Sequence, residues 1–293
     1  TVRNSGDPGQ GPHEAGVAIR SSFFAPTFDG LEVSGSVGPG VHSTSGGAMQ
    51  GSDWVLHNNT KQGVIVDRAT VVVEGMHLAN NGYSAAHVLD ARRIDFWNLT
   101  AENNGASPSA TVEEQAGLYY FESNNVESAS GDVRCRNCSI SGSTGQGLLA
   151  VNSVDLWLEG LHLEDNNPTM PAFEVDNGDT MPGGASGRVQ VTNAHVEAET
   201  PGQPAVKFHR AAVEVNGLTM AGNHSGLEWR GDNNGQFPSY LNNSVLSGTQ
   251  CVLLEGHPSL NGHGNRISSA CTGSITLTDS QVNWSGLIDD RAG

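Results

Sequence analysis

Residues 204–220 read PAVKFHRAAVEVNGLTM, and this stretch contains two phrases that recur along the 293-residue chain. The first phrase is a small residue, then Gly or Ala, an apolar residue, any residue, an apolar residue and a polar residue. Repeats of about 20 to 50 residues indicate a stacked solenoid rather than an ordinary globular core. Ten copies, spaced 17 to 33 residues apart, begin at Ala15, Ser45, Gln62, Ala85, Ala116, Gln146, Pro171, Pro204, Ser225 and Gln250.

The second phrase, seen in residues 213–220 (VEVNGLTM), alternates apolar residues on both sides of a Gly, Asn or Asp. Strict alternation predicts strands with one buried face. Gly, Asn and Asp tolerate a left-handed backbone, so we expect a bend of one residue between two strands. Each coil is therefore predicted to hold three short strands. Other clear copies begin at Val71, Ile94, Leu156 and Val189.

Coils of this kind predict an all-β fold, a single-stranded parallel β-helix of about 10–11 coils. The pattern over residues 15–284 resembles the right-handed parallel β-helix proteins of the pectate-lyase-like superfamily. The resemblance and the crossover rule both imply a right-handed spiral. A β-sandwich or a propeller is the alternative, but irregular coil lengths and one-residue bends fit these folds poorly. We expect a polar N-terminal segment or cap (1–14), the β-helix domain (15–284) and a C-terminal tail (285–293).

Composition limits the partners of the chain. The net charge is −17 and only two lysines are present, which argues against nucleic acid or an anionic membrane as partner. No apolar run approaches the ~18 residues that a membrane span needs. We therefore expect no nucleic-acid partner and no membrane span.

The four cysteines are Cys135, Cys138, Cys251 and Cys271. The last two are 20 residues apart, close to one coil, so they are placed to bond between neighbouring coils. Cys135 and Cys138 fall at inward positions on either side of a turn. Core thiols or structural disulfides are favoured over a redox or metal motif, which needs a partner motif that is missing. Disulfides favour an extracellular, cell-surface or periplasmic location.

Outward residues of stacked coils form columns with a spacing of about 4.8 Å. In the middle coils one strand face is predicted to be apolar, and such a patch normally marks a contact surface. Either the loop 101–115 or the C-terminal tail folds over it, or the patch binds a partner or a second copy of the chain. Its residues are Ile65, Val88, Tyr119, Phe121, Leu149 and Val151.

The later coils are predicted to present a charged surface on the same columns. A polysaccharide lyase needs a base and cations, which Lys207, His209 or Arg230 would supply. A glycoside hydrolase needs two carboxylates, for which Glu174 and Glu228 are the candidates. The alternative is a structural ladder of alternating charges. The candidate catalytic residues are Glu174, Asp176, Lys207, His209, Glu228 and Arg230.

A second cluster is predicted after the bend, where His162 and Glu164 lie one coil from His195 and Glu197. Two imidazoles and two carboxylates are suitable ligands for a divalent metal, Zn or Cu. The alternative is a row of solvated polar side chains. No other cofactor is expected.

We expect a secreted or cell-surface scaffold whose flat faces and loops bind polysaccharide or a surface glycan, another surface or copies of itself. Two alternatives remain open. One is a polysaccharide lyase, glycoside hydrolase or epimerase with its site on the face from Glu174 to Arg230. The other is a periplasmic metal-binding β-helix protein. Both kinds of protein occur in the superfamily that the repeat resembles.

Overall fold

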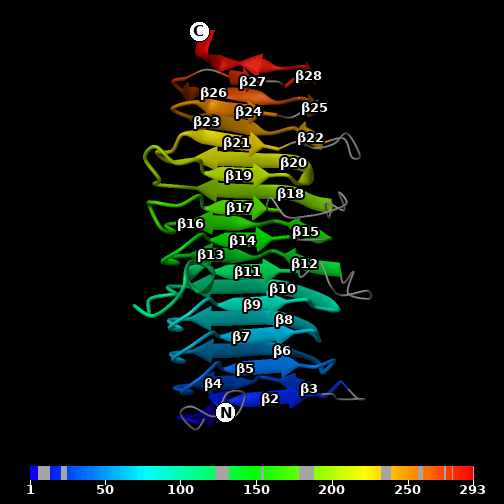
Figure 1. Cartoon of the computed structure of the whole chain (residues 1–293), viewed down its shortest axis with the longest axis vertical. Helices are drawn as coiled ribbons and strands as arrows, with labels where there is room; N and C mark the ends of the chain where they lie inside the picture. The colour runs from blue at the N-terminus through cyan, green and yellow to red at the C-terminus, as the bar shows by residue number, and fades with distance from the viewer. Residues whose placement is uncertain are drawn as a thin grey trace.

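In the computed structural model the chain winds into a parallel β-helix whose coils stack along one long axis (Figure 1). The N-terminus lies at one end of the stack and the C-terminus at the other. This architecture confirms the fold predicted from the repeat. The structure describes residues 1–5, 14–20, 25–122, 132–152, 155–177, 188–231, 239–256, 260–273, 275–278 and 280–292.

Each coil contributes one strand to an 11-stranded parallel sheet, which consists largely of the predicted first phrases. Val206 pairs with Leu227 in the next layer, as the stacking of matching phrases requires. The strands are β2 (Val17–Arg20), β5 (Val41–Thr44), β7 (Val64–Asp67), β9 (Ala86–Leu89), β11 (Leu118–Phe121), β14 (Leu148–Val151), β17 (Phe173–Asp176), β19 (Val206–His209), β21 (Gly226–Arg230), β24 (Cys251–Glu255) and β27 (Ile275–Thr278).

The other strands form an 18-stranded sheet with two arms, a first arm before the bend of each coil and a second arm after it. In five coils a single ten-residue strand runs through both arms: β6 (Ala48–His57), β8 (Thr70–Ala79), β10 (Arg93–Glu102), β18 (Arg188–Glu197) and β20 (Ala212–Ala221). Elsewhere the arms are separate strands: β3 (Thr27–Asp29) and β4 (Glu32–Ser34), β12 (Asp132–Arg136) and β13 (Ser139–Ser141), β15 (Leu156–Glu159) and β16 (His162–Glu164), β22 (Ser239–Asn242) and β23 (Val245–Gly248), β25 (Leu260–His263) and β26 (Arg266–Cys271), β28 (Val282–Ser285) and β29 (Ile288–Asp289). The short β1 (Val2–Arg3) pairs with β4.

Each bend has one residue with a left-handed backbone, as the second phrase predicts. The φ angle is 54° at Asn98 and 80° at Gly217. This region disfavours most L-residues because Cβ approaches the backbone, so Gly, Asn and Asp occupy it. The bend residues are Gly30, Asp53, Gly75, Asn98, Asn137, Gly160, Asn193, Gly217, Asn243, Gly264 and Gly286.

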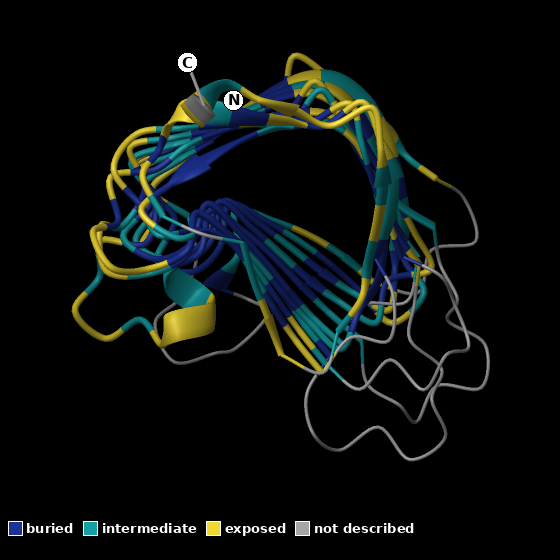
Figure 2. Ribbon diagram, turned by 90° about the horizontal axis from the view of Figure 1, so that it is seen from above, coloured by how far each residue is buried: buried dark blue, intermediate teal, exposed yellow. Residues whose placement is uncertain are grey.

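The inward side chains of both sheets form a continuous apolar core. The view along the axis shows buried residues lining the walls of the spiral, with exposed ones at the outer surface and the turns (Figure 2). Phe173, Phe208 and Trp229 come from three successive coils and are fully buried. Their ring centroids are 5.4 and 4.9 Å apart, with edge-on geometry. Such contacts stabilise a core beyond the burial of apolar area.

A ladder of buried asparagines holds one turn of the early coils in register. Asn59, Asn81 and Asn104 stack on successive coils and are at most 1% exposed. The Asn81 side chain accepts hydrogen bonds from the backbone and side-chain nitrogens of Asn59 and donates to Asn104 Oδ1 and to the carbonyl of Leu56. The ladder therefore satisfies polar groups that stacking places away from water.

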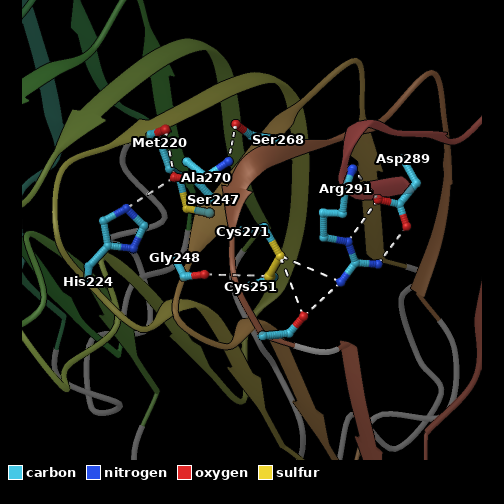
Figure 3. Close-up of a disulfide and its surroundings, with 11 residues drawn as sticks. Met220, His224, Ser247, Gly248, Cys251, Ser268, Ala270, Cys271, Asp289 and Arg291 are labelled. Carbon is cyan, nitrogen blue, oxygen red and sulfur yellow. Dashed lines mark hydrogen bonds and ion pairs between the residues drawn. A yellow bond between two sulfur atoms is a disulfide. The ribbon is translucent and has the colours of Figure 1, made fainter. Parts of the chain in front are cut away.

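The four cysteines form two disulfides, consistent with the predicted structural role. Cys135 and Cys138 are joined across the bend at Asn137, and Cys251 and Cys271 are joined after one circuit of the spiral. Figure 3 shows the second disulfide beside Arg291, which donates to the carboxylate of Asp289. Arg291 belongs to the short 3-10 helix η2 (Asp290–Ala292).

Two copies of the first phrase were wrongly placed by the sequence pattern. The copy at Ser45 is not a strand of the 11-stranded sheet, because β5 supplies that coil and Val41 pairs with Val64. The copy at Ala85 is shifted by one residue, because Ala86 pairs with Val64. In the second case the small apolar residue Ala86 stands at an inward position, which made the alternation ambiguous.

Candidate functional site

Glu174 and Lys207 are the centre of the predicted charged surface and lie in register on β17 and β19. Lys207 Nζ lies 2.6 Å from Glu174 Oε1, and Gln146 Nε2 donates to Glu174 Oε2 over 2.9 Å. The side chain of Glu174 is only 10% exposed. Both of its carboxylate oxygens therefore have partners.

The other four predicted catalytic residues lie beside this pair and are also engaged. His209 Nδ1 lies 2.9 Å from Asp176 Oδ1. Arg230 Nε lies 2.8 Å from Glu228 Oε1 and 3.4 Å from Glu255 Oε2. The structure thus brings the six residues together, but with each carboxylate next to a cation or an imidazole.

This arrangement limits the chemistry of the charged surface. Glu174 and Glu228 are two strands apart, which places their Cα atoms about 10 Å from each other. Lys207 lies between them. A ladder of opposite charges in neighbouring strands has this form without any catalytic role. The catalytic assignment of these residues stays a prediction.

The predicted metal cluster is also assembled, although its rings do not converge. His162 and His195 pair in register, and their rings stack with centroids 5.0 Å apart at an angle of 10°. Each Nε2 points to the glutamate two residues along its own strand, 3.2 Å from Glu164 Oε2 and 4.0 Å from Glu197 Oε2.

Parallel rings at this spacing hold their nitrogens side by side, whereas a Zn²⁺ ion binds ligand nitrogens at about 2.0–2.1 Å. One ion would need the two rings to rotate toward each other. Within the described ranges, no three His, Cys, Asp or Glu residues are arranged to hold a metal ion. Zn or Cu binding at His162 and His195 stays a prediction.

The predicted apolar patch is not an open surface. Tyr119 and Leu149 are 6% and 5% exposed, and they pack with Ala116 against Phe121 and Val151. Val88 was wrongly included, because the shifted register of β9 turns it into the core at 2% exposure. The outward positions of β9 belong instead to His87 and Leu89, which therefore border the patch.

The loop at residues 101–115 contains the helix α1 (Val112–Gln115), which lies outside the spiral wall (Figure 2). The His87 and Tyr119 rings are 4.6 Å apart, and the charge of Glu113 on α1 acts on both. Burial lowers the pKa of His87 to about 4 and raises the pKa of Tyr119 to about 12. Glu113 opposes the first shift and adds to the second. This loop therefore lies beside the patch, as one of the two sequence interpretations requires.

The most unusual exposed groups lie on a surface that the sequence analysis did not single out. Among the described residues, Trp97, Trp157 and Tyr240 are the exposed aromatic side chains, each 37–40% exposed. All three lie on the first arm of the 18-stranded sheet, on β10, β15 and β22. We call the outer surface of this arm the aromatic face.

The register spreads these rings along the axis of the spiral, with Trp97 in the neighbouring outward column, two residues further along the strand than Trp157. Trp157 and Tyr240 share a column, through Gln190 and Glu214. At about 4.8 Å per strand, Trp157 lies about 10 Å from the coil of Trp97 and about 14 Å from the coil of Tyr240. Three aromatic rings are therefore spread over about 24 Å of one flat surface.

Arginines hold the two tryptophans in place. The guanidinium of Arg136 lies 4.8 Å from the ring centroid of Trp97, and that of Arg134 lies 5.2 Å from the ring centroid of Trp157. The Trp97 indole nitrogen also donates to the buried carboxylate of Asp95. Cation–π contacts of this kind contribute about 0.5–1 kcal/mol at exposed sites. The rings are thus fixed while part of each stays accessible.

A first hollow of about 340 Å³ opens on the aromatic face beside Trp97. Gly51 lies in its floor, where a Cβ atom would approach the carbonyl oxygen of Phe28 to 1.9 Å. The glycine is therefore required by the close packing below the hollow. Trp97 forms one side of the hollow. The polar side chains that surround its floor are Thr27, Asp29, Gln50, Ser52 and Glu74.

A second hollow of about 620 Å³ lies on the same face near the C-terminal end. Its floor also contains a glycine, Gly262, whose Cβ would lie 2.0 Å from the Leu241 carbonyl oxygen. Tyr240 forms an aromatic side, and the rest is rich in amides and hydroxyls. The polar lining consists of Glu214, Asn242, Asn261, His263, Asn283 and Ser285.

A signal for this face was present in the sequence. Trp97 follows Phe96, and Trp157 stands between Leu156 and Leu158, so both occupy the variable positions of the second phrase. In an alternating strand these positions point outward. A sheet face that contacts only solvent does not need a large indole side chain. A tryptophan at an outward position was therefore the signal for this face.

Comparison of the chain with protein-family models, with curated proteins and with solved structures finds no match. No described helix has the length and hydropathy that crossing a membrane requires.

Proposed function

We propose that this protein is a secreted or cell-surface β-helix scaffold that binds polysaccharide along its aromatic face. The observation that carries the proposal is the row formed by Trp97, Trp157 and Tyr240 on one arm of one sheet. A long, flat ligand that runs parallel to the axis contacts all three rings. A polysaccharide chain has this shape, with an apolar ring face and a polar edge on every sugar.

The residues around the rings supply polar groups that can hydrogen-bond to sugar hydroxyls. Binding sites combine apolar surface with a few placed polar groups that fix the orientation of the ligand. Here Gln50 and Thr27 border the first hollow, and Asn261 and Asn283 border the second. Amides and hydroxyls both donate and accept, as sugar hydroxyls require.

The location follows from the disulfides and is part of the same proposal. Two disulfides in one chain favour an oxidising compartment, so we place the protein outside the cell or in a periplasm. We also propose that the chain belongs to the pectate-lyase-like superfamily, which its repeat resembles and which contains many proteins that act on polysaccharides. The stacking of its coils and the residues at its bends support this assignment.

Binding to insoluble and soluble polysaccharides tests the function. We expect the wild type to be retained by at least one of a panel of neutral and charged glycans, with a shift of tryptophan emission on binding. Trp97→Ala, Trp157→Ala and Tyr240→Ala should each weaken retention about tenfold, as loss of a buried aromatic contact of about 1.4 kcal/mol does.

The matched controls are Val55→Ala and Leu277→Ala, which shorten side chains that are at least 37% exposed but lie off the aromatic face. Circular dichroism verifies that every variant keeps its strand content. Equal retention of the aromatic variants and the controls would refute the proposed function, as would failure of the wild type to bind any glycan.

An enzyme acting on the bound polysaccharide is the second candidate. The observation that favours it is the ion pair of the nearly buried Glu174 with Lys207, flanked by Glu228 two strands from Glu174. If this pair is catalytic, Lys207→Met and Glu228→Gln abolish release of unsaturated or reducing ends from a glycan that the wild type cleaves. Unchanged cleavage by both variants would exclude the charged surface as the site.

A further inference from the structure

We propose that the first hollow is a subsite for a protonated amino sugar, so that the preferred ligand is a hexosamine polymer with free amino groups. This inference rests on the proposed function and adds the chemical class of the ligand. It is carried by two carboxylates in the hollow, by the absence of a cation paired with them among the described residues and by the indole that forms one side.

The two carboxylates flank the middle of the hollow. Asp29 pairs in register with Ser52, and Ser52 pairs with Glu74, so all three share one outward column. The Cα atoms of Asp29 and Glu74 are about 10 Å apart by strand spacing. Ser52 Oγ donates to Asp29 Oδ1 over 3.0 Å, which fixes that carboxylate at the edge of the floor. The two carboxylates therefore stand along one edge of the hollow, on either side of Ser52, and a ligand in the hollow lies beside both negative charges.

These carboxylates differ from those of the charged surface in their partners. Among the residues that the structure describes, neither Asp29 nor Glu74 has a cation within ion-pair distance. The guanidinium of Arg136 comes from β12, on the other side of β10 from the hollow, and lies 3.8 Å from Glu159. The hollow therefore has an excess of negative charge that a cationic ligand neutralises.

Trp97 favours a cation that is carried on a flat apolar ring, such as an amino sugar. Because Arg136 covers the indole from the β12 side, the side toward β8 faces the hollow. The bond from the indole nitrogen to Asp95 fixes the orientation of the ring. An aromatic wall favours the flat apolar face of a sugar ring, and cations gain further from the π face.

Size and polarity also agree with a sugar. The volume of about 340 Å³ is within the lower range of small-molecule sites. Gln50 Nε2 donates to Thr27 Oγ1 over 3.0 Å, which leaves the amide oxygen of Gln50 and the hydroxyl hydrogen of Thr27 for sugar hydroxyls. A uronate would place its carboxylate against Asp29 or Glu74, so polyuronates are disfavoured by repulsion.

Titration calorimetry with four oligosaccharides of equal length tests the inference: glucosamine, N-acetylglucosamine, glucose and galacturonate oligomers. We expect the glucosamine oligomer to bind the wild type about tenfold more tightly than the glucose oligomer at low salt and mildly acidic pH. Asp29→Asn with Glu74→Gln should remove this preference, so that the glucosamine and glucose oligomers bind the variant about equally. High salt should also reduce the preference of the wild type for the glucosamine oligomer, because salt screens the attraction between the amine and the carboxylates.

Two controls separate the subsite from the net charge of −17. Glu102→Gln with Glu199→Gln removes the same two charges elsewhere, and it should keep the preference for glucosamine. Oligolysine tests for a cationic peptide as the ligand. Equal displacement of the glucosamine oligomer by oligolysine and by more glucosamine oligomer would overturn the inference.

The outcomes distinguish this inference from the function on which it rests. Binding of neutral oligomers that depends on Trp97, without preference for the amine, overturns the subsite and leaves polysaccharide binding intact. A preference that survives Asp29→Asn with Glu74→Gln also overturns it. If no oligosaccharide binds, both proposals fail.

Discussion

Replacing Asn81 by alanine should destabilise the early coils more than replacing any exposed asparagine by alanine does. The Asn81 side chain is fully buried and makes hydrogen bonds to Asn59, Leu56 and Asn104. Alanine deletes all of them without changing the backbone. It leaves the backbone nitrogen and the side-chain Nδ2 of Asn59 as buried donors whose described acceptor is gone.

The size of the effect follows from those two orphaned donors. A buried donor without a partner costs about 1–3 kcal/mol. The acceptors suffer less, because Asn104 Oδ1 still accepts from the backbone nitrogen of Asn81. Two orphaned donors then give a loss of about 3–4 kcal/mol in the free energy of unfolding.

The assay is equilibrium denaturation in urea, combined with hydrogen exchange of the backbone amides around Asn59 and Asn104. Repeat proteins are held by contacts between neighbouring coils, so the faster exchange should be concentrated in the coils next to residue 81. Asn216→Ala is the matched control. It deletes an exposed bond from Asn243 Nδ2 and should cost less than about 0.5 kcal/mol.

Asn81→Asp provides a second test of the same reasoning. The carboxylate keeps the acceptor oxygen but faces Asn104 Oδ1 and the Leu56 carbonyl without a donor. We expect this variant to be unstable at neutral pH and to recover partly on acidification, when the carboxyl regains a proton. If Asn81→Ala stays within about 1 kcal/mol of Asn216→Ala, the buried ladder does not stabilise the fold as argued.

Three further predictions concern the pH dependence, the disulfides and the ion pair. Burial lowers the pKa of His87 to about 4, so the folded state binds fewer protons than the unfolded state between pH about 6.5 and 4. Stability should fall by about 3 kcal/mol as the pH drops through this window, and His87→Phe should reduce that fall in parallel denaturation curves. Cys251→Ser with Cys271→Ser removes a crosslink between residues 20 apart and should lower the free energy of unfolding by about 3 kcal/mol. Cys135→Ser with Cys138→Ser removes a crosslink between residues three apart and should lower it by about 2 kcal/mol, with both values measured by denaturation in urea. Lys207→Met leaves the nearly buried Glu174 without its cation and should cost about 2 kcal/mol, which Glu174→Gln in the same chain should largely restore.

The architecture could be predicted from the sequence because it depends on local alternation. Many strands alternate between buried and less buried residues, and each bend residue is one of the few types that adopt a left-handed backbone. The pairing of β17, β19 and β21 follows directly, so Glu174, Lys207 and Glu228 were correctly placed next to one another. The pattern failed at Ala86, where a small residue left the inward set ambiguous, and at Ser45, where it missed β5.

The use of the surfaces could not be predicted in the same way. The apolar patch at Tyr119 is covered, and whether a loop folds back over a face depends on contacts between distant residues. The stacked geometry of His162 and His195 is likewise a matter of side-chain rotation, which spacing does not determine. The first hollow is lined by residues of four successive coils, among them Gly51 in its floor and Trp97 at its side, so no single coil predicts it.

The sequence alone determined that the chain is a spiral of stacked coils and, outside the coils of β5 and β9, which residues of the first phrase share a column, since alternation and bend chemistry act within a few residues. Only the tertiary structure decided which columns are open to solvent and where they are hollowed. Those properties arise when side chains from separate coils fill or leave space between them, and no local pattern records that outcome.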